Sequence, residues 1–249
     1  MRAASNWLRR RCDPEFNRPR EVFMSTNTES TDNPQGASNM IVESLVVGPL
    51  QTNVYVIGCT KTRRGAIVDA GGNAARLLKL AEKHELTIES ILQTHAHIDH
   101  VAAIPEVKRA TQAPIYLHPA DQFMWQVAPQ QGMRFGIQVE PLPDYEHELS
   151  DGQRIKVGEL ECEVIFVPGH SPGSVAFYFA EHALVLSGDV LFAGSMGRVD
   201  LPGSDPNAMR KSLERMKQLP DDTRVLSGHG PETSIGREKK LNPFLRGGW

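Results

Sequence analysis

Short apolar runs that each end in a histidine or an aspartate recur along this chain, and they constrain its fold more than any other feature. Runs of this length, rich in β-branched residues and closed by turn residues, predict strands. Polar residues that leave several strand ends can meet at one rim of a sheet fold. The residues that follow these runs are all possible metal ligands: Asp69, His95, His97, Asp99, His100, His170, Asp189 and His229.

The densest of these segments, Thr94-His95-Ala96-His97-Ile98-Asp99-His100, indicates a metal site. Extended spacing sends His95 and His97 to the same side of the backbone, and imidazole and carboxylate groups suit zinc, iron or manganese. If a helix begins at Asp99, then Asp99 and His100 turn toward a neighbouring position, so one peptide could serve two metals. A solvated histidine tract is the alternative, but this segment lies between a predicted strand and the amphipathic segment 101–111.

Composition indicates one large α/β domain without a strongly charged partner. The chain has 249 residues, 40% of them hydrophobic, and a formal net charge of -3 from 27 basic and 30 acidic residues. These values give no reason to expect nucleic-acid or membrane binding, and no apolar run reaches the ~18 residues of a membrane span. Cys12, Cys59 and Cys162 form no CxxC pair; we interpret the last two as core residues and expect a reducing, cytoplasmic location.

The pattern of the chain divides it into two parts. Residues 1–39 are rich in Arg, Ser, Thr, Asn and Pro and are predicted to be a disordered N-terminal extension, with Met24 as an alternative start. Residues 40–249 alternate predicted strands and helices, with a Pro- and Gly-punctuated loop at 128–150. Strands are expected at 41–47, 53–57, 65–69, 88–93, 115–117, 154–157, 160–167, 175–179, 183–186 and before His229, and helices at 73–84, 99–111, 119–127 and 206–219.

The order and form of these segments resemble the five motifs of the metallo-β-lactamase superfamily of hydrolases. The resemblance begins near Met40, and the stretches 192–200 and 228–245 are similar to the compact type II branch of glyoxalase II, whose members cleave thioesters of glutathione. It implies an α/β fold: a four-layer αββα sandwich with two mixed β-sheets flanked by helices, spanning residues 40–249.

The resemblance also implies a dinuclear site, with zinc as the first expectation and iron or manganese as alternatives. It implies that a hydroxide shared by two divalent cations attacks the thioester carbonyl. The implied first-metal ligands are His95, His97 and His170, and those of the second metal are Asp99, His100 and His229, with Asp189 bridging.

Three further roles follow from the resemblance. Asp99 is expected to orient the attacking hydroxide as well as hold a metal, and Asp69 to set the tautomer of a ligand histidine. An ordinary turn is the alternative for Asp69. Arg198 is expected to bind a substrate carboxylate, with a surface ion pair to Asp200 as the alternative. The expected partner is a small-molecule thioester, for which glutathione is the candidate carrier; the oligomeric state is left open.

Two departures from the family pattern leave alternatives open. Ala96 stands where the family usually has glycine, which would strain the loop if that position needs a positive φ. The resemblance runs to about residue 245, so we also expect no helical C-terminal domain of the kind with which longer glyoxalase II enzymes bind glutathione. The alternatives are a persulfide dioxygenase with a single iron, a hydrolase of another ester-like substrate, a β-lactamase, a nuclease, or a di-iron electron-transfer module.

Overall fold

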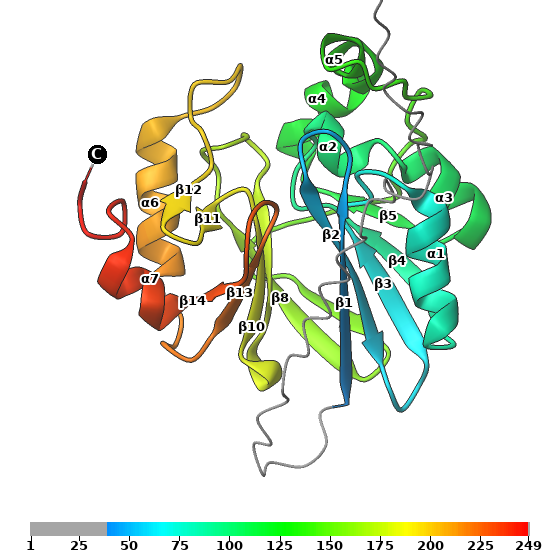
Figure 1. Ribbon diagram of the computed structural model, residues 1–249, viewed down its shortest axis with the longest axis horizontal. Coiled ribbons are helices and arrows are strands. Elements are labelled where there is room, and N and C mark those ends of the chain that lie inside the picture. Colours follow the sequence, from blue (N-terminus) through cyan, green and yellow to red (C-terminus); the bar gives the residue numbers. More distant parts are fainter. Residues whose placement is uncertain (1–38, 249) are drawn as a thin grey trace, which may run out of the picture. The chain divides into compact units, whose positions relative to one another are not determined.

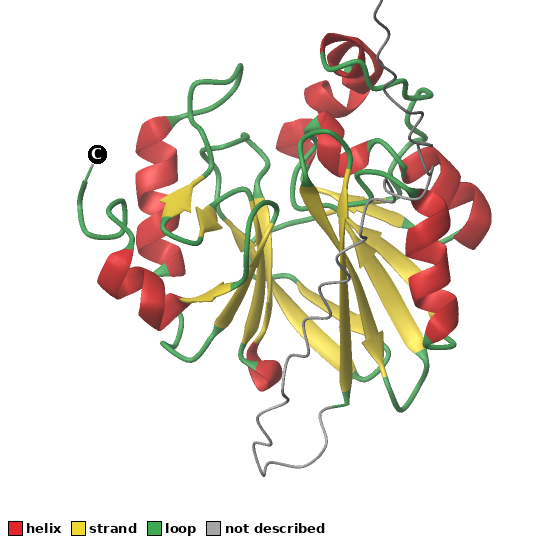
Figure 2. Cartoon of the chain, in the orientation of Figure 1, coloured by secondary structure: helices red, strands yellow, loops and turns green. Residues whose placement is uncertain are grey.

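The computed structural model describes residues 39–248, and this part of the chain is built from two six-stranded sheets packed face to face (Figure 1). Helices cover the outer face of each sheet (Figure 2). The predicted αββα sandwich with two mixed sheets is therefore confirmed. Residues 1–38 of the segment predicted to be disordered lie outside the described residues.

The first sheet has the strand order β1-β2-β3-β4-β5-β6. Its first two pairings are antiparallel, and the three pairings from β3 to β6 are parallel. In chain order the elements of this half are β1 (Met40–Val47), β2 (Thr52–Cys59), β3 (Arg64–Val68), α1 (Ala74–Lys83), β4 (Thr87–Leu92), α2 (Ile98–Val101), α3 (Ile104–Thr111), β5 (Ile115–Leu117), the 3-10 helix η1 (Pro119–Asp121), α4 (Gln122–Gln126), α5 (Ala128–Arg134) and β6 (His147–Glu148).

The second sheet has the order β14-β13-β10-β9-β8-β7, and only β10 and β13 pair in parallel. A separate two-stranded sheet joins β11 to β12. The elements of this half are β7 (Arg154–Val157), β8 (Leu160–Phe166), β9 (Val175–Phe179), η2 (Ala180–His182), β10 (Leu184–Gly188), β11 (Leu191–Phe192), β12 (Ser195–Met196), α6 (Pro206–Met216), β13 (Arg224–Ser227), β14 (Thr233–Ser234) and α7 (Ile235–Leu241).

Central strands are buried on both faces because each sheet is covered on both sides. Along β2, Val54 and Val56 pack in the apolar cluster beneath α1 and α3, whereas Tyr55 and Ile57 pack between the two sheets. This split follows from the alternation of side chains along an extended chain. The second sheet repeats it, with the even-numbered Leu residues of β10 in the inter-sheet core and the intervening valine under α6.

The two cysteines in the described residues lie in this inter-sheet core. Cys59 and Cys162 are both fully buried and free of disulfides. The expectation that they are small core residues is confirmed. Burial raises the pKa of the Cys162 thiol to about 12, so this group is protonated and unreactive at neutral pH.

The predicted helix at 99–111 is instead two helices, α2 and α3. Pro105 lies in the first turn of α3 and has no N–H to donate to the carbonyl of Val101, so the ladder of α2 cannot continue. The backbone N–H of Ala103, at the joint, donates instead to the carbonyl oxygen of Ala70 at 2.8 Å.

The predicted loop at 128–150 contains helix α5 and strand β6. Pro129 lies in the first turn of α5, where the missing N–H costs nothing, so the proline starts a helix there rather than ending one. Helix α7 and the short strands β11, β12 and β14 were also not expected. The side chain of Ser234 caps α7 by accepting a hydrogen bond from the backbone N–H of Arg237 at 3.3 Å.

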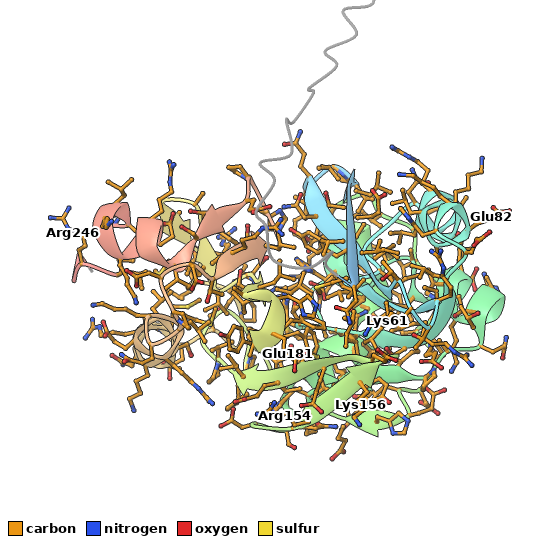
Figure 3. The ribbon with its side chains drawn as sticks, turned by 90° about the horizontal axis from the view of Figure 1, so that it is seen from below. Lys61, Glu82, Arg154, Lys156, Glu181 and Arg246 are labelled. Carbon is orange, nitrogen blue, oxygen red and sulfur yellow. The ribbon has the colours of Figure 1, made fainter. Side chains whose placement is uncertain are left out.

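Ion pairs lie near one end of the sandwich, in a turn and between strands β7 and β8. Figure 3, seen from below, shows Lys61, Arg154 and Lys156 on this surface. Lys61 lies 3.1 Å from Glu159, and Arg154 lies 3.0 Å from Glu161. Strand β3 begins near this end, and its first residue, Arg64, lies opposite Thr87, the first residue of the parallel strand β4. The histidines that follow β4 therefore lie at the opposite end of the sandwich.

Candidate metal centre

The ligand-type residues meet at the end of the sandwich where five strands terminate. Strands β3 and β4 are parallel neighbours, and so are β10 and β13, so the residues that follow each pair leave the sheet at the same edge. The β8–β9 loop adds one histidine from the second sheet. The residues brought together are His95, His97, Asp99, His100, His170, Asp189 and His229.

A first group is made of three imidazoles, from His95, His97 and His170, whose ring nitrogens lie within 4.8 Å of one another. Nδ1 of His97 and Nε2 of His170 are 2.8 Å apart. Burial lowers the pKa of all three rings, to about 3 for His97. They are therefore neutral at physiological pH, which is the form that binds a metal.

A second group contains one carboxylate and two imidazoles. The Oδ2 atom of Asp99 lies 3.5 Å from Nε2 of His100 and 3.3 Å from Nε2 of His229. Burial by itself would lower the pKa of both rings, but Asp99 and Asp189 raise it, to about 10 for His229. This group therefore concentrates negative charge beside its imidazoles, as a cation site requires.

Asp189 lies between the two groups. One carboxylate oxygen, Oδ2, is 3.4 Å from Nε2 of His170 and 3.4 Å from Nε2 of His229. The other, Oδ1, is 3.5 Å from Nε2 of His100. The carboxylate therefore faces imidazoles of both groups at once.

Asp69 forms hydrogen bonds to Thr94 and to His100 at the edge of the centre. Its Oδ1 accepts a hydrogen bond from the backbone N–H of Thr94, and its Oδ2 accepts bonds from the Thr94 hydroxyl and from Nδ1 of His100, at 2.7 to 2.9 Å. Nε2 of His100 is thereby left to face the second group. Asp69 also forms a turn, with φ 56° and a 2.6 Å bond from the N–H of Gly71 to its carbonyl, and its role in setting the tautomer of a ligand histidine stays a prediction.

The residues present fit a metal by their own chemistry. Nε2 of His95, Nε2 of His100 and Oδ1 of Asp189 are buried without a hydrogen-bond partner. Buried polar atoms of this kind are costly unless something satisfies them. All three belong to residues of these two groups or to Asp189, which lies between them, and a mixed nitrogen and carboxylate donor set suits zinc, iron or manganese.

The loop between His95 and His97 carries no left-handed strain. Ala96 is fully buried and is absent from the positive-φ residues of the described chain, so its Cβ is tolerated. Its backbone N–H donates to Oδ2 of Asp121 at 3.0 Å. The alanine is therefore compatible with the placement of the ligand histidines.

Arg198 contributes its backbone rather than its side chain. Its carbonyl oxygen accepts a hydrogen bond from Nδ1 of His170 at 2.8 Å, which turns Nε2 of that ring toward the centre. The guanidinium is largely exposed and forms two bonds to Asp200, at 2.7 and 2.8 Å. This is the ion pair that was the alternative interpretation, and a substrate contact by Arg198 stays a prediction.

Several residues that hold the centre have no motif in the sequence. The Thr52 hydroxyl donates to Oδ2 of Asp99 at 2.7 Å. Asn53 and Tyr55 both donate to the carbonyl of Ser227, at 2.9 and 2.7 Å, and so fix the turn that leads to His229. The only local signal was a set of polar residues inside an otherwise apolar strand.

Comparison with known proteins identifies the family of this chain. A sequence profile of the metallo-β-lactamase superfamily matches residues 47–229. The chain therefore belongs to the metallo-β-lactamase superfamily.

Two curated relatives resemble nearly the whole of the described chain. The probable metallo-hydrolase YqgX of Bacillus subtilis is 40% identical over 204 residues, covering 81% of this chain and 95% of the relative. The hydroxyacylglutathione hydrolase GloC of Haemophilus influenzae is 36% identical over 215 residues, covering 83% and 98%. Both names describe hydrolases.

Two solved structures share the fold. TTHA1623 in a di-iron-bound form is 42% identical with a TM-score of 0.75, covering 82% of this chain and all of that chain. The BLEG-1 B3 metallo-β-lactamase is 37% identical with a TM-score of 0.77, covering 83% of this chain and all of that one. Within residues 39–248, no helix combines the length and the apolar character needed to cross a membrane.

Proposed function

We propose that this protein is a dinuclear metal-dependent hydrolase that cleaves a thioester such as S-lactoylglutathione. The observation that carries the proposal is the position of Asp189, whose carboxylate faces an all-imidazole group and a mixed carboxylate–imidazole group at 3.4 to 3.5 Å. An arrangement with two adjoining donor sets is the one that two-metal hydrolysis needs.

Each group of side chains has a separate task in this proposal. The imidazoles of His95, His97 and His170 would hold the first cation, and the group of Asp99, His100 and His229 would hold the second. Bound there, divalent cations would lower the pKa of a water molecule and would supply positive charge beside the substrate carbonyl. Asp99, anchored by the Thr52 hydroxyl at 2.7 Å, orients the nucleophile, and Asp69 keeps His100 in the required tautomer.

The thioester part of the proposal rests on chemistry and on one relative. A thiolate is a good leaving group, so no strong general acid is needed beside the centre. The hydroxyacylglutathione hydrolase GloC is matched over 98% of its length, which supports a glutathione-linked substrate. Arg198, which exchanges Asp200 for a substrate carboxylate, is the proposed contact to that carrier. We place the activity in the cytoplasm, consistent with free, buried Cys59 and Cys162.

A β-lactam is the second candidate substrate. It is favoured by the likeness to BLEG-1, which is named a B3 metallo-β-lactamase. Hydrolysis of a thioester releases a thiol, whereas hydrolysis of a β-lactam does not. The two activities can therefore be distinguished by their products.

The test combines metal analysis with a substrate panel. Purified protein is loaded with zinc, iron or manganese, and its metal content is measured by elemental analysis. Hydrolysis of S-lactoylglutathione, of another acyl thioester and of nitrocefin is then followed, together with oxygen consumption with glutathione persulfide. We expect two ions per chain and thiol release from S-lactoylglutathione. Turnover of nitrocefin, or oxygen consumption with glutathione persulfide, without thiol release from S-lactoylglutathione would contradict the proposal.

Asp189→Ala tests the bridging role. We expect both the metal content and the thioesterase activity to fall, the latter by more than roughly 100-fold, because the Asp189 carboxylate lies 3.4 to 3.5 Å from imidazoles of both groups. Asp222→Ala, which removes an exposed carboxylate, is the matched control and should leave both unchanged. Full dinuclear occupancy in Asp189→Ala would contradict the bridging assignment.

A further inference from the structure

A buried carboxylate outside the donor set connects the two loops that carry the first imidazole group. Asp121 ends η1 and is fully buried. Its Oδ2 accepts hydrogen bonds from the backbone N–H of Ala96 at 3.0 Å and from the Ser171 hydroxyl at 2.8 Å. Its Oδ1 accepts a bond from the backbone N–H of Gly173 at 2.5 Å.

The positions of these three donors give the carboxylate its significance. Ala96 lies between His95 and His97, in the loop that follows β4 of the first sheet. Ser171 and Gly173 follow His170, in the β8–β9 loop of the second sheet. One side chain therefore joins, across the two sheets, the loops whose imidazoles form the first group.

The buried position of the Asp121 carboxylate requires a glycine at residue 173 and is energetically unfavourable. A Cβ on Gly173 would lie 2.7 Å from Oδ1 of Asp121, so only glycine allows the carboxylate to approach. None of the described contacts of Asp121 is to a cation, and a buried carboxylate with only neutral donors is expensive. Burial accordingly raises the pKa of Asp121 to about 6. A group this costly is more easily explained by a positional task than by stability.

We propose that Asp121 is a positioning residue that preorganises His95, His97 and His170 for the first metal. It contacts no proposed ligand side chain and acts through backbone N–H groups of both loops and through the Ser171 hydroxyl. The loops also have other anchors, including a backbone bond from Val175 to Thr94 at 2.8 Å and a bond from the Ser204 hydroxyl to the carbonyl of His170 at 2.7 Å. Loss of Asp121 should therefore loosen the first group without unfolding the domain.

The inference rests on the proposed metal centre but can fail independently of it. The variant Asp121→Asn keeps the size of the side chain and replaces one acceptor with a donor. Metal affinity is measured by competition with a chelating dye, and Co²⁺-loaded protein is examined by NMR. The Nδ1–H of His170, held by the Arg198 carbonyl, reports on the first group, and that of His100, held by Asp69, reports on the second.

We expect Asp121→Asn to bind the first cation about 10- to 100-fold more weakly and to shift or lose the His170 signal, with the His100 signal retained. Glu238→Gln is the matched control. Glu238 is also fully buried and accepts bonds from the Thr233 hydroxyl, from the N–H of Gly194 and from Asn242, but it touches neither loop. The Glu238→Gln variant should have a lower melting temperature than the wild type and an unchanged His170 signal.

Wild-type affinity and an unchanged His170 signal in Asp121→Asn would overturn the inference, whereas wild-type protein that binds no metal would overturn the proposed function instead. If Asp121→Asn does not fold, Ser171→Ala decides. This variant removes one of the three donors, and it should weaken the first site and move the His170 signal. Unchanged metal binding in Ser171→Ala would then also reject the positioning role.

Discussion

Gly228 gives the sharpest test of how tightly the metal centre is packed. A Cβ at this position would lie 2.1 Å from Oδ1 of Asp189 and 2.8 Å from Cε1 of His100. The backbone cannot easily retreat, because its N–H donates to the carbonyl of Gly188 at 2.9 Å and its carbonyl accepts from the N–H of Asn53 at 2.7 Å. In Gly228→Ala the Asp189 carboxylate must therefore move by roughly 1 Å or more.

The magnitude follows from the cost of inserting one methyl group into a packed site. Overpacking of this kind costs about 1–3 kcal/mol. If that cost falls on the bound state, it corresponds to a metal dissociation constant roughly 5- to 150-fold larger. Because Gly228 does not have a positive φ, alanine adds no backbone strain at this position. A change in the metal dissociation constant therefore reports on the displaced Asp189 carboxylate.

The assay is competition between the protein and a chelating dye, with the melting temperature of the metal-free protein measured in parallel. Gly230→Ala is the control in the same loop. Gly230 has φ +76° and nothing within 4 Å of a new Cβ, so alanine there should cost about 1 kcal/mol of stability and leave metal affinity unchanged. A dissociation constant within twofold of wild type in Gly228→Ala would refute the reasoning.

Two further predictions concern residues around the centre. Tyr55→Phe removes the 2.7 Å bond to the Ser227 carbonyl and leaves that buried acceptor with one donor fewer, so chemical denaturation should show a loss of about 1 kcal/mol in the free energy of unfolding. Arg198→Ala should raise KM for S-lactoylglutathione more than it lowers kcat and should leave metal content unchanged, because the backbone carbonyl that holds His170 remains. An unchanged KM would remove Arg198 from the substrate site.

Much of the fold could be predicted because its strands have recognisable patterns of apolar residues within short segments of the sequence. The alternation in β8 and the apolar runs of β2, β4 and β10 place their side chains on covered faces without reference to distant segments. Helices were less readable where proline was involved. Pro105 divided one predicted helix and Pro129 began an unexpected one, since the effect of a proline depends on whether the preceding chain is already helical.

The residues proposed as ligands could be found in the sequence because histidine and aspartate are conspicuous where a strand ends. The residues that hold them could not. Asp121 bonds to Ser171, 50 positions away, and Tyr55 bonds to Ser227, 172 positions away. Neither pairing leaves a pattern in the segment that contains it.

The sequence by itself therefore determined which side chains we propose as metal ligands, because ligand type and strand periodicity are local properties of the chain. Only the tertiary structure decided how those side chains face one another. Asp189 reaches both groups, and Asp121 joins the loops of two sheets, through contacts between segments that become neighbours only when the sheets pack. Hydrogen bonds and close approaches of this kind depend on distances that the order of residues does not encode locally.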